Sequence, residues 1–382
     1  MSHNDLNLPP VKYLPRLEQV WDWMDSEGIS LVMLEDASGR RDQSVRWLTG
    51  QPGDALLFLS FNRRALLVPW DINLARQFVN EPAIEIAPYT EYGRLPKKAV
   101  AAAAKRLGIA NGSKIEIPSI TPYPSFLDFV GELADFDIIC REKGASAEFK
   151  RFRTYKDDEE IAIYRKAAEI TNGLIDLIEA DVKSGKIKTE ADAALLIETE
   201  SRRHGCEGPG FGTLAAGVHR SFAIHAFPQY TFAPFAGPGL SILDFGVRLA
   251  GYTTDVTLTF ARSLNPQQER LVALVERAYE KCLALAQPGV PASDVGIAIE
   301  KLFAKEKKKM PHGLGHGVGL DEHEYPVFRA EKDNEWTLEP GMVFTLEPGL
   351  YDPAEGGCRL ENDILLTPAG QEVLTKSRII RL

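Results

Sequence analysis

The stretch LSILDFGVRLAGYTTDVTLTF, residues 240–260, contains two strand-like runs that follow each other closely. Each run is largely apolar or β-branched, and each holds one carboxylate in such a setting, Asp244 in the first and Asp255 in the second. Burying an unpaired carboxylate is costly. An acid in such a run therefore indicates either a strand end that turns to solvent or a site that holds a cation, and for one isolated acid the strand end is favoured.

Two further acids show the same pattern, Glu347 in FTLEPGLY and Glu361 in CRLENDILL. Four carboxylates in four apolar runs would repel one another strongly unless something cationic neutralised them. Two divalent ions would balance the four negative charges. Carboxylate ligands favour hard or intermediate cations, and one imidazole shifts the preference toward Mn²⁺, Co²⁺ or Zn²⁺ rather than Ca²⁺.

The stretch HGLGHGVGLDEHEYP, residues 312–326, is a source of imidazole ligands. Each of its four glycines would cost about 1 kcal/mol in a helix, so an extended or looped backbone close to a ligand is predicted instead. In an extended chain, residues 312 and 316 face the same way, so His312 and His316 can share a site. A mobile glycine-rich loop with incidental histidines is the alternative, and we favour the site because the four acids need a partner.

The first 150 residues alternate helix and strand patterns, which is typical of an α/β unit. Residues 16–28 predict an amphipathic helix that ends at Gly28. Two apolar runs, 55–61 and 64–70, predict a β-hairpin because only two polar residues separate them. Further strands are expected at 29–36, 45–50 (VRWLTG), 114–119 and 136–140, and helices at 71–79 and 97–107.

The polar segment 143–156 is interpreted as a linker between two domains, residues 1–150 and 151–382. In the second domain two pairs of amphipathic helices are each followed by strand-like segments. Such segregation predicts an α+β fold with helices covering one face of an antiparallel sheet. The helices are expected at 157–185, 189–205, 265–286 and 292–309.

Composition narrows the class of protein. The formal net charge of −10 argues against a nucleic-acid partner, which would need a basic face. No apolar run approaches the ~20 residues of a membrane-spanning helix, and the first residues lack the pattern of a secretory signal. The four cysteines are scattered without a CxxC pair and are expected to be reduced thiols. We therefore expect a cytoplasmic protein with no membrane partner.

With these motifs in hand, the chain resembles the pita-bread metallohydrolases, specifically the aminopeptidase P and prolidase group, along its whole length. The N-terminal half resembles the creatinase-type domain of these enzymes, and the second half their pita-bread catalytic domain. Five motifs occur in the family's order: LDFG, an aspartate after GYTT, HGLGHGVG, LEPGMVFTLEPGLY and RLEND. One departure is Leu258, which stands where the family often has an arginine.

The resemblance implies a site for two divalent metal ions, most often Mn²⁺, with Co²⁺ or Zn²⁺ possible. Asp244 would bind one ion, His316 and Glu347 the other, and Asp255 and Glu361 would bridge both. A hydroxide held between the ions, with its pKa lowered, would be the nucleophile.

The resemblance also implies catalytic roles. Glu347 would shuttle a proton from the attacking water to the leaving nitrogen. His323 would stabilise the tetrahedral oxyanion, and His312 would line the substrate pocket. His225, nineteen residues before Asp244, matches a family histidine less closely. Arg359, two residues before Glu361, would orient a metal-bound carboxylate.

The implied function is that of a metal-dependent Xaa-Pro aminopeptidase, an exopeptidase acting on proline-containing peptides as a homodimer. The alternatives are a Xaa-Pro dipeptidase and a hydrolase of a small non-peptide amide on the same fold. A catalytically inactive binding module is disfavoured because all five ligand positions are kept. Phe222, Phe227 and Tyr230 could line a proline pocket, although packing in the core is the simpler interpretation of each.

Overall fold

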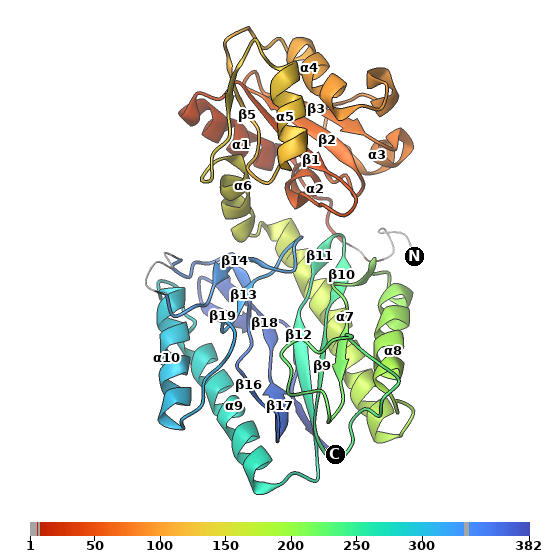
Figure 1. The fold of residues 1–382 in the computed structure, drawn as a ribbon, viewed down its shortest axis with the longest axis vertical. Helices are drawn as coiled ribbons and strands as arrows, with labels where there is room; N and C mark the ends of the chain where they lie inside the picture. Colours follow the sequence, from red (N-terminus) through yellow and green to blue (C-terminus); the bar gives the residue numbers. More distant parts are fainter. Residues whose placement is uncertain (1–5, 7, 332–335) are drawn as a thin grey trace. The chain divides into compact units, whose positions relative to one another are not determined.

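The computed structural model describes residue 6, residues 8–331 and residues 336–382. The chain divides into two compact units, one comprising Val11–Arg153 and the other formed mainly by Thr154–Leu382. Figure 1 shows that strands form the centre of each unit and that helices flank them.

The first unit is built on a six-stranded mixed sheet with the order β4-β3-β2-β1-β5-β6. Its strands are β1 (Leu31–Asp36), β2 (Ala55–Ser60), β3 (Arg64–Pro69), β4 (Ile84–Ile86), β5 (Lys114–Glu116) and β6 (Asp137–Ile139). β1, β2 and β3 pair antiparallel, whereas β4, β5 and β6 lie parallel to their neighbours. The predicted hairpin is confirmed, with Ser60 opposite Arg64.

Helices flank this sheet and contribute to its core. They are α1 (Leu14–Glu27), α2 (Gln43–Thr49), α3 (Ile72–Phe78), α4 (Pro96–Arg106), α5 (Tyr123–Glu132) and α6 (Ala145–Thr154), with a 3₁₀ helix η2 (Tyr89–Tyr92). The helix predicted over residues 16–28 is confirmed, and Gly28 ends it in the left-handed conformation, with φ 63°.

One prediction for this region is wrong. The VRWLTG segment, expected as a strand, lies in α2, because Asp42 caps the helix by accepting from Ser44 N and Gly50 ends it with φ 78°. The polar segment 143–156, interpreted as a linker, contains the helix α6, and the boundary between the two units falls inside it, between Arg153 and Thr154. The buried carboxylate of Glu116 accepts from Ala145 N at the start of α6, at 2.6 Å.

Two main sheets form the second unit. In the first, order β20-β12-β9-β8, β9 pairs antiparallel with β12 and places Asp244 opposite Thr257, while β20 lies parallel to β12. The second has the order β14-β13-β15-β18-β19, and smaller sheets join β11-β10-β7 and β16-β17. The strands are β7 (Gly208–Pro209), β8 (Leu214–Ala216), β9 (Gly239–Phe245), β10 (Val247–Leu249), β11 (Tyr252–Thr253), β12 (Val256–Arg262), β13 (His316–Gly317), β14 (Glu324–Val327), β15 (Val343–Leu346), β16 (Gly349–Asp352), β17 (Gly356–Arg359), β18 (Asn362–Thr367), β19 (Gly370–Val373) and β20 (Ile379–Arg381).

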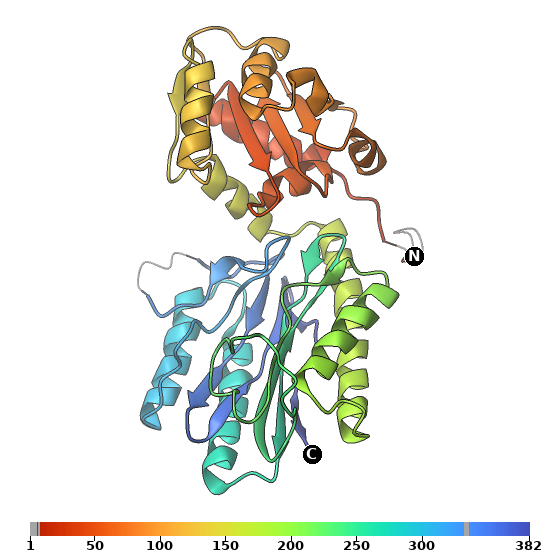
Figure 2. The same ribbon diagram turned by 45° about the vertical axis from the view of Figure 1, so that its right-hand side comes forward.

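Two helix pairs cover these sheets: α7 (Asp158–Lys183) with α8 (Glu190–Arg203), and α9 (Pro266–Leu285) with α10 (Ala292–Lys305). α7 and α8 contact β7, β8, β10 and β11, whereas α9 and α10 contact β14 to β17. Figures 1 and 2 show the two pairs on opposite sides of the strands. The predicted α+β fold is confirmed, although the strands form two main sheets rather than one and β20 lies parallel to β12. Among the described residues, no helix combines the length and the apolar character needed to cross a membrane.

Candidate metal centre

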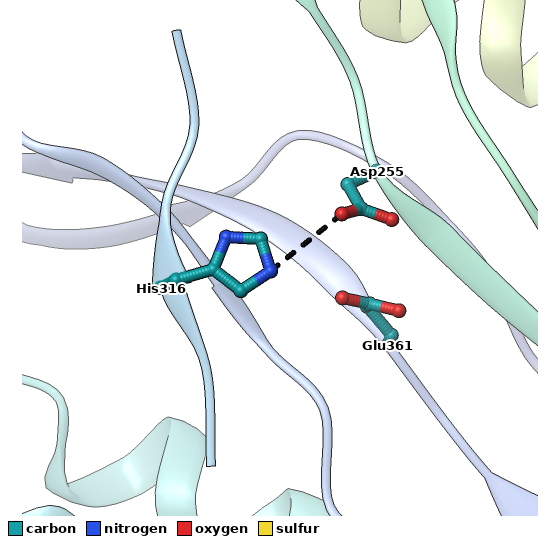
Figure 3. A group of neighbouring side chains, drawn as sticks. All are labelled: Asp255, His316 and Glu361. Carbon is teal, nitrogen blue, oxygen red and sulfur yellow. Dashed lines mark ion pairs between the residues drawn. The ribbon is translucent and has the colours of Figure 1, made fainter. Parts of the chain in front are cut away.

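Three of the predicted ligands converge at the place where the two main sheets of the second unit meet. Asp255, His316 and Glu361 each offer one ligand atom, and these atoms all lie within 4.8 Å of one another. Figure 3 shows the imidazole of His316 facing the two carboxylates, and its Nε2 lies 3.7 Å from Asp255 Oδ2. The three side chains come from sequence positions 45 to 106 residues apart, so only the fold brings them together.

The pairing of the strands explains this convergence. Leu346 of β15 lies opposite Asn362 of β18, so Glu347 and Glu361, each one residue beyond this pair, become neighbours. An isolated bridge between Thr257 and Glu361 joins the β9–β12 sheet to the same place. Thr257 Oγ1 donates to Glu361 Oε2 at 2.6 Å and fixes that carboxylate.

Glu347 lies between His312 and His316, two of the three histidines of the glycine-rich stretch. Its Oε1 is 3.8 Å from His316 Nε2, and its Oε2 is 3.6 Å from His312 Nδ1. The backbone here is not helical, as predicted, and His316 and Gly317 form the strand β13. Gly315 is required for a steric reason, because a Cβ there would lie 2.1 Å from the backbone oxygen of Thr345.

Asp244, near the end of β9, is 8% exposed, and only one of its two carboxylate oxygens has a hydrogen-bond partner. Its Oδ2 accepts from the guanidinium of Arg359, while its Oδ1 is buried without a hydrogen-bond partner. Arg359 also donates to Thr257 Oγ1 and to the hydroxyl of Tyr351, each at 2.8 Å. The Tyr351 hydroxyl lies 3.1 Å from His312 Nε2, so a chain of polar contacts links Asp244 to His312.

The carboxylates of the cluster outnumber the cationic side chains beside them, so the cluster carries uncompensated negative charge when its acids are ionised. Burial raises the pKa of Asp255 well above its usual range, and the charges of Glu361 and Asp244 raise it further. Burial and the charge of Asp244 likewise raise the pKa of Glu361 to about 7, although Arg359 opposes this. Burial lowers the pKa of His316 to about 3, so its imidazole is neutral and able to bind a cation.

The residues present fit divalent metal ions. Carboxylate oxygens with one imidazole nitrogen form a donor set suited to Mn²⁺, Co²⁺ or Zn²⁺. The unpartnered Asp244 Oδ1 is a buried acceptor that a cation would satisfy. Bound cations would also relieve the repulsion that raises these pKa values.

Supporting contacts come from residues to which sequence reasoning gave no role. Asp363 is fully buried, and its two carboxylate oxygens lie 3.2 and 3.1 Å from Asp255 N, which donates to them. Thr345 Oγ1 accepts from His316 N at 3.2 Å. Asp363 and Tyr351 both lie within motifs quoted above, RLEND and LEPGLY, so their proximity to the predicted ligands was the available signal.

The structure also places the other predicted histidines near the cluster. The ring of His323 lies 4.1 Å from that of His316, centroid to centroid, and its side chain is 64% exposed. His225 is exposed, and Arg359 Nη1 donates to the carbonyl of the preceding residue, Ile224, at 3.3 Å. Burial raises the pKa of Asp244, and Arg359 opposes this shift, as do His225 and His323 to a smaller extent.

The aromatic residues near His225 are not part of the core. Phe222 and Tyr230 are each 42% exposed and Phe227 is 94% exposed. Core packing is therefore the wrong interpretation of these side chains.

Comparison with known proteins assigns the chain to a protein family. Residues 162–368 match the model of metallopeptidase family M24. The chain belongs to this family, and it is a metal-dependent hydrolase with the pita-bread fold. The resemblance found in the sequence motifs is thereby confirmed.

Individual proteins similar to this chain are consistent with the family assignment. A Xaa-Pro dipeptidase from Pyrococcus furiosus is 33% identical, and the match covers 95% of this chain and 98% of that protein. A putative dipeptidase from Bacillus subtilis is also 33% identical, over 61% of this chain and 63% of its own length. The crystal structure of an X-Pro aminopeptidase from Thermotoga maritima superposes with a TM-score of 0.82 at 24% identity, over 96% of this chain and 99% of that one, and shows the shared fold.

Proposed function

We propose that this chain hydrolyses the peptide bond between an N-terminal residue and proline. The observation that carries the proposal is the convergence of Asp255, His316 and Glu361 on one point beside Glu347, in a chain of metallopeptidase family M24. The names of its relatives, Xaa-Pro dipeptidase and X-Pro aminopeptidase, supply the substrate class.

In this proposal five side chains hold two divalent ions, with Mn²⁺ as the expected metal. Asp244 would hold an ion through the oxygen that lacks a hydrogen-bond partner. Asp255, His316, Glu347 and Glu361 would supply the other ligands. Ions held there supply a water activated for attack at neutral pH and polarise the scissile carbonyl.

The neighbouring side chains would then direct protons and charge. Glu347, between His312 and His316, accepts a proton from the attacking water and returns it to the leaving proline nitrogen. His323 and His225 are exposed, so they can reach a bound substrate, and each donates a hydrogen bond to it. His312, held by its contact with the Tyr351 hydroxyl, lines the pocket for the residue that precedes proline or for proline itself.

All of these residues belong to the unit formed mainly by Thr154–Leu382. We therefore propose that this unit is the catalytic domain and that Val11–Arg153 is an accessory domain of the creatinase type. We also propose a homodimer, and a cytoplasmic location in keeping with the four free cysteines. Monomeric elution in gel filtration at micromolar concentration would contradict the dimer.

Two substrate preferences remain to be separated. The motifs led us to expect an aminopeptidase that accepts longer peptides. The relative from Pyrococcus furiosus, which the match covers over 98% of its length, is instead a Xaa-Pro dipeptidase. The test is hydrolysis of Ala-Pro and Ala-Pro-Ala side by side, on chelated protein and after addition of Mn²⁺. Metal-restored cleavage mainly of the tripeptide identifies an aminopeptidase, and cleavage mainly of the dipeptide identifies a prolidase. No cleavage of either peptide by protein with metal bound would contradict the proposal and favour another small amide as the substrate.

A further inference from the structure

One buried carboxylate contacts both ends of the loop that carries His225, beside a backbone hydrogen bond from Ala215 N to Gln229 O at 2.9 Å. Residues 217–231 contain no helix or strand, and a loop of this length with its two ends held together is an Ω-loop. The carboxylate belongs to Glu190, at the start of α8, whose side chain is fully buried. Nothing in the sequence motifs assigned a role to this residue.

Glu190 contacts both ends of the loop. At the first end, Gly217 N donates to its Oε1 at 2.8 Å, and the guanidinium of Arg220 donates to its Oε2. At the far end, the backbone N and the hydroxyl of Thr231 donate to Oε2 at 2.7 and 2.6 Å. Four donors on a buried charged acceptor form strong hydrogen bonds, and their loss would leave several buried donors unsatisfied.

The middle of the same loop is hydrogen-bonded to β9, to β17 and to Arg359. Ser221 Oγ donates to Leu240 O of β9 at 2.7 Å and accepts from Gly357 N of β17 at 3.2 Å. Ile224 O accepts from Arg359, the residue whose guanidinium also binds Asp244. His225 follows directly, so its position depends on the contacts of the loop before and after it.

We propose that Glu190 is a positioning residue that holds the 217–231 loop closed and thereby places His225 at the substrate. The inference rests on the proposed function, because His225 acts only if peptides are cleaved at this centre. It concerns a residue remote in sequence from every motif of the site, and it assigns to α8 a part in catalysis rather than only in the core.

The first experiment measures kcat and KM on Ala-Pro and Ala-Pro-Ala for wild type, Glu190→Ala, His225→Ala and the double variant. A misplaced catalytic group costs roughly 10- to 100-fold in kcat/KM, and we expect that loss for Glu190→Ala, mainly in kcat. In the His225→Ala background the same substitution should cost less than about threefold, because the group that it positions is gone. An equal loss in both backgrounds would overturn the proposal.

A second readout does not depend on activity. The loop exposes Phe222, so chymotrypsin can cut the Phe222–Ala223 bond when the loop opens. We expect Glu190→Ala to raise that cleavage rate roughly tenfold or more in metal-loaded protein, since hydrogen bonds to the buried charge close the loop. Unchanged cleavage would overturn the proposal.

Milder and matched variants guard against misfolding. Thr231→Val removes one donor to Glu190 and should raise loop cleavage and lower kcat, whereas Thr231→Ser keeps the hydroxyl and should behave as wild type. Glu116→Gln is the matched control, because Glu116 is equally buried and accepts from an arginine and a backbone N–H, but in the other unit. It should leave kcat/KM within about twofold and loop cleavage unchanged. A Thr231→Val variant identical to Thr231→Ser in both readouts would count against the proposal, as would an effect of Glu116→Gln equal to that of Glu190→Ala.

Wild-type protein that cleaves neither peptide would defeat the proposed function. The proposal on Glu190 then stands or falls with the cleavage rates at Phe222–Ala223.

Discussion

Both units bury carboxylates, and the partners of these carboxylates differ. In the first unit, Glu116 accepts from Arg141 and from Ala145 N, each at 2.6 Å. In the second unit, Asp244, Asp255 and Glu361 are comparably buried. Of these three, Asp244 accepts a hydrogen bond from Arg359, and Glu361 accepts one from Thr257. Within the described residues, no side chain donates a hydrogen bond to the carboxylate of Asp255.

The difference separates structural acids from ligands. A buried carboxylate with its own cation and backbone donors is satisfied by the protein alone. A group of four acids, with Glu347 included, that has one guanidinium among them carries excess negative charge when ionised, and bound cations or protons must balance it. Glu190, with Arg220 and three further donors, belongs to the first kind although it lies in the second unit.

The largest expected effect comes from removing one acid of the cluster. Asp255→Asn should lower kcat/KM on the order of a thousandfold, because the metal ions contribute several kcal/mol of transition-state stabilisation. The metal-free variant should be as stable as metal-free wild type or more so, since one uncompensated charge has gone. Kinetics and urea unfolding in chelator measure the two quantities. A metal-free variant that is clearly less stable than metal-free wild type would contradict the distinction between structural acids and metal ligands.

A smaller loss is expected from Arg359→Lys. Lysine keeps the positive charge but cannot contact Asp244, Thr257 and Tyr351 together as the guanidinium does. We expect kcat/KM to fall roughly 10- to 100-fold, as for other residues that orient metal ligands. Metal analysis of the same sample should show both ions retained, and loss of both would place Arg359 among the determinants of metal binding instead.

Glu116→Gln should act on stability alone. The amide presents only one acceptor oxygen to Arg141 and Ala145 N, so a buried donor is left unsatisfied. The free energy of unfolding should fall by about 1–3 kcal/mol, while peptide cleavage stays within about twofold of wild type. Chemical denaturation and the peptide assay test this, and a large loss of activity without loss of stability would show that the first unit's acids are not merely structural.

A purely pH-dependent effect on stability concerns Asp36, whose pKa burial raises to about 7 although Arg41 opposes the shift. The folded state therefore binds a proton that the unfolded state has released. The stabilising contribution of this group is fully present below about pH 4 and is lost as the pH rises to about 7, by up to about 1.4 kcal/mol per pH unit. Asp36→Asn should gain stability relative to wild type across that range and keep a constant difference above it. A difference that does not vary with pH would contradict the assignment.

The sequence was sufficient for the elements with a strong period and for naming the three side chains that converge at the candidate metal centre. The four long helices of the second unit and the strands around Asp244 and Glu361 follow from hydrophobic patterning. Hydrophobic patterning gave the wrong element for α2, because a short buried helix and a buried strand have similar apolar runs. The cap at Asp42 favours the helix.

Contacts between distant segments were harder to foresee. The position of Tyr351 between Arg359 and His312 depends on the pairing of β16 with β17. Glu190 lies 27 residues or more from each donor that it binds. A charged residue at the start of an amphipathic helix is ordinarily explained by the helix dipole, so no local pattern marks its second role.

We propose that two divalent ions balance the buried acids of the second unit. The most direct test is the metal content of wild-type protein after equilibration with Mn²⁺ and removal of unbound metal, with Asp255→Asn and Glu116→Gln treated in parallel. Two ions per chain are expected in wild type and in Glu116→Gln, and one or none in Asp255→Asn. No bound metal in wild type, or two ions in Asp255→Asn, would contradict it.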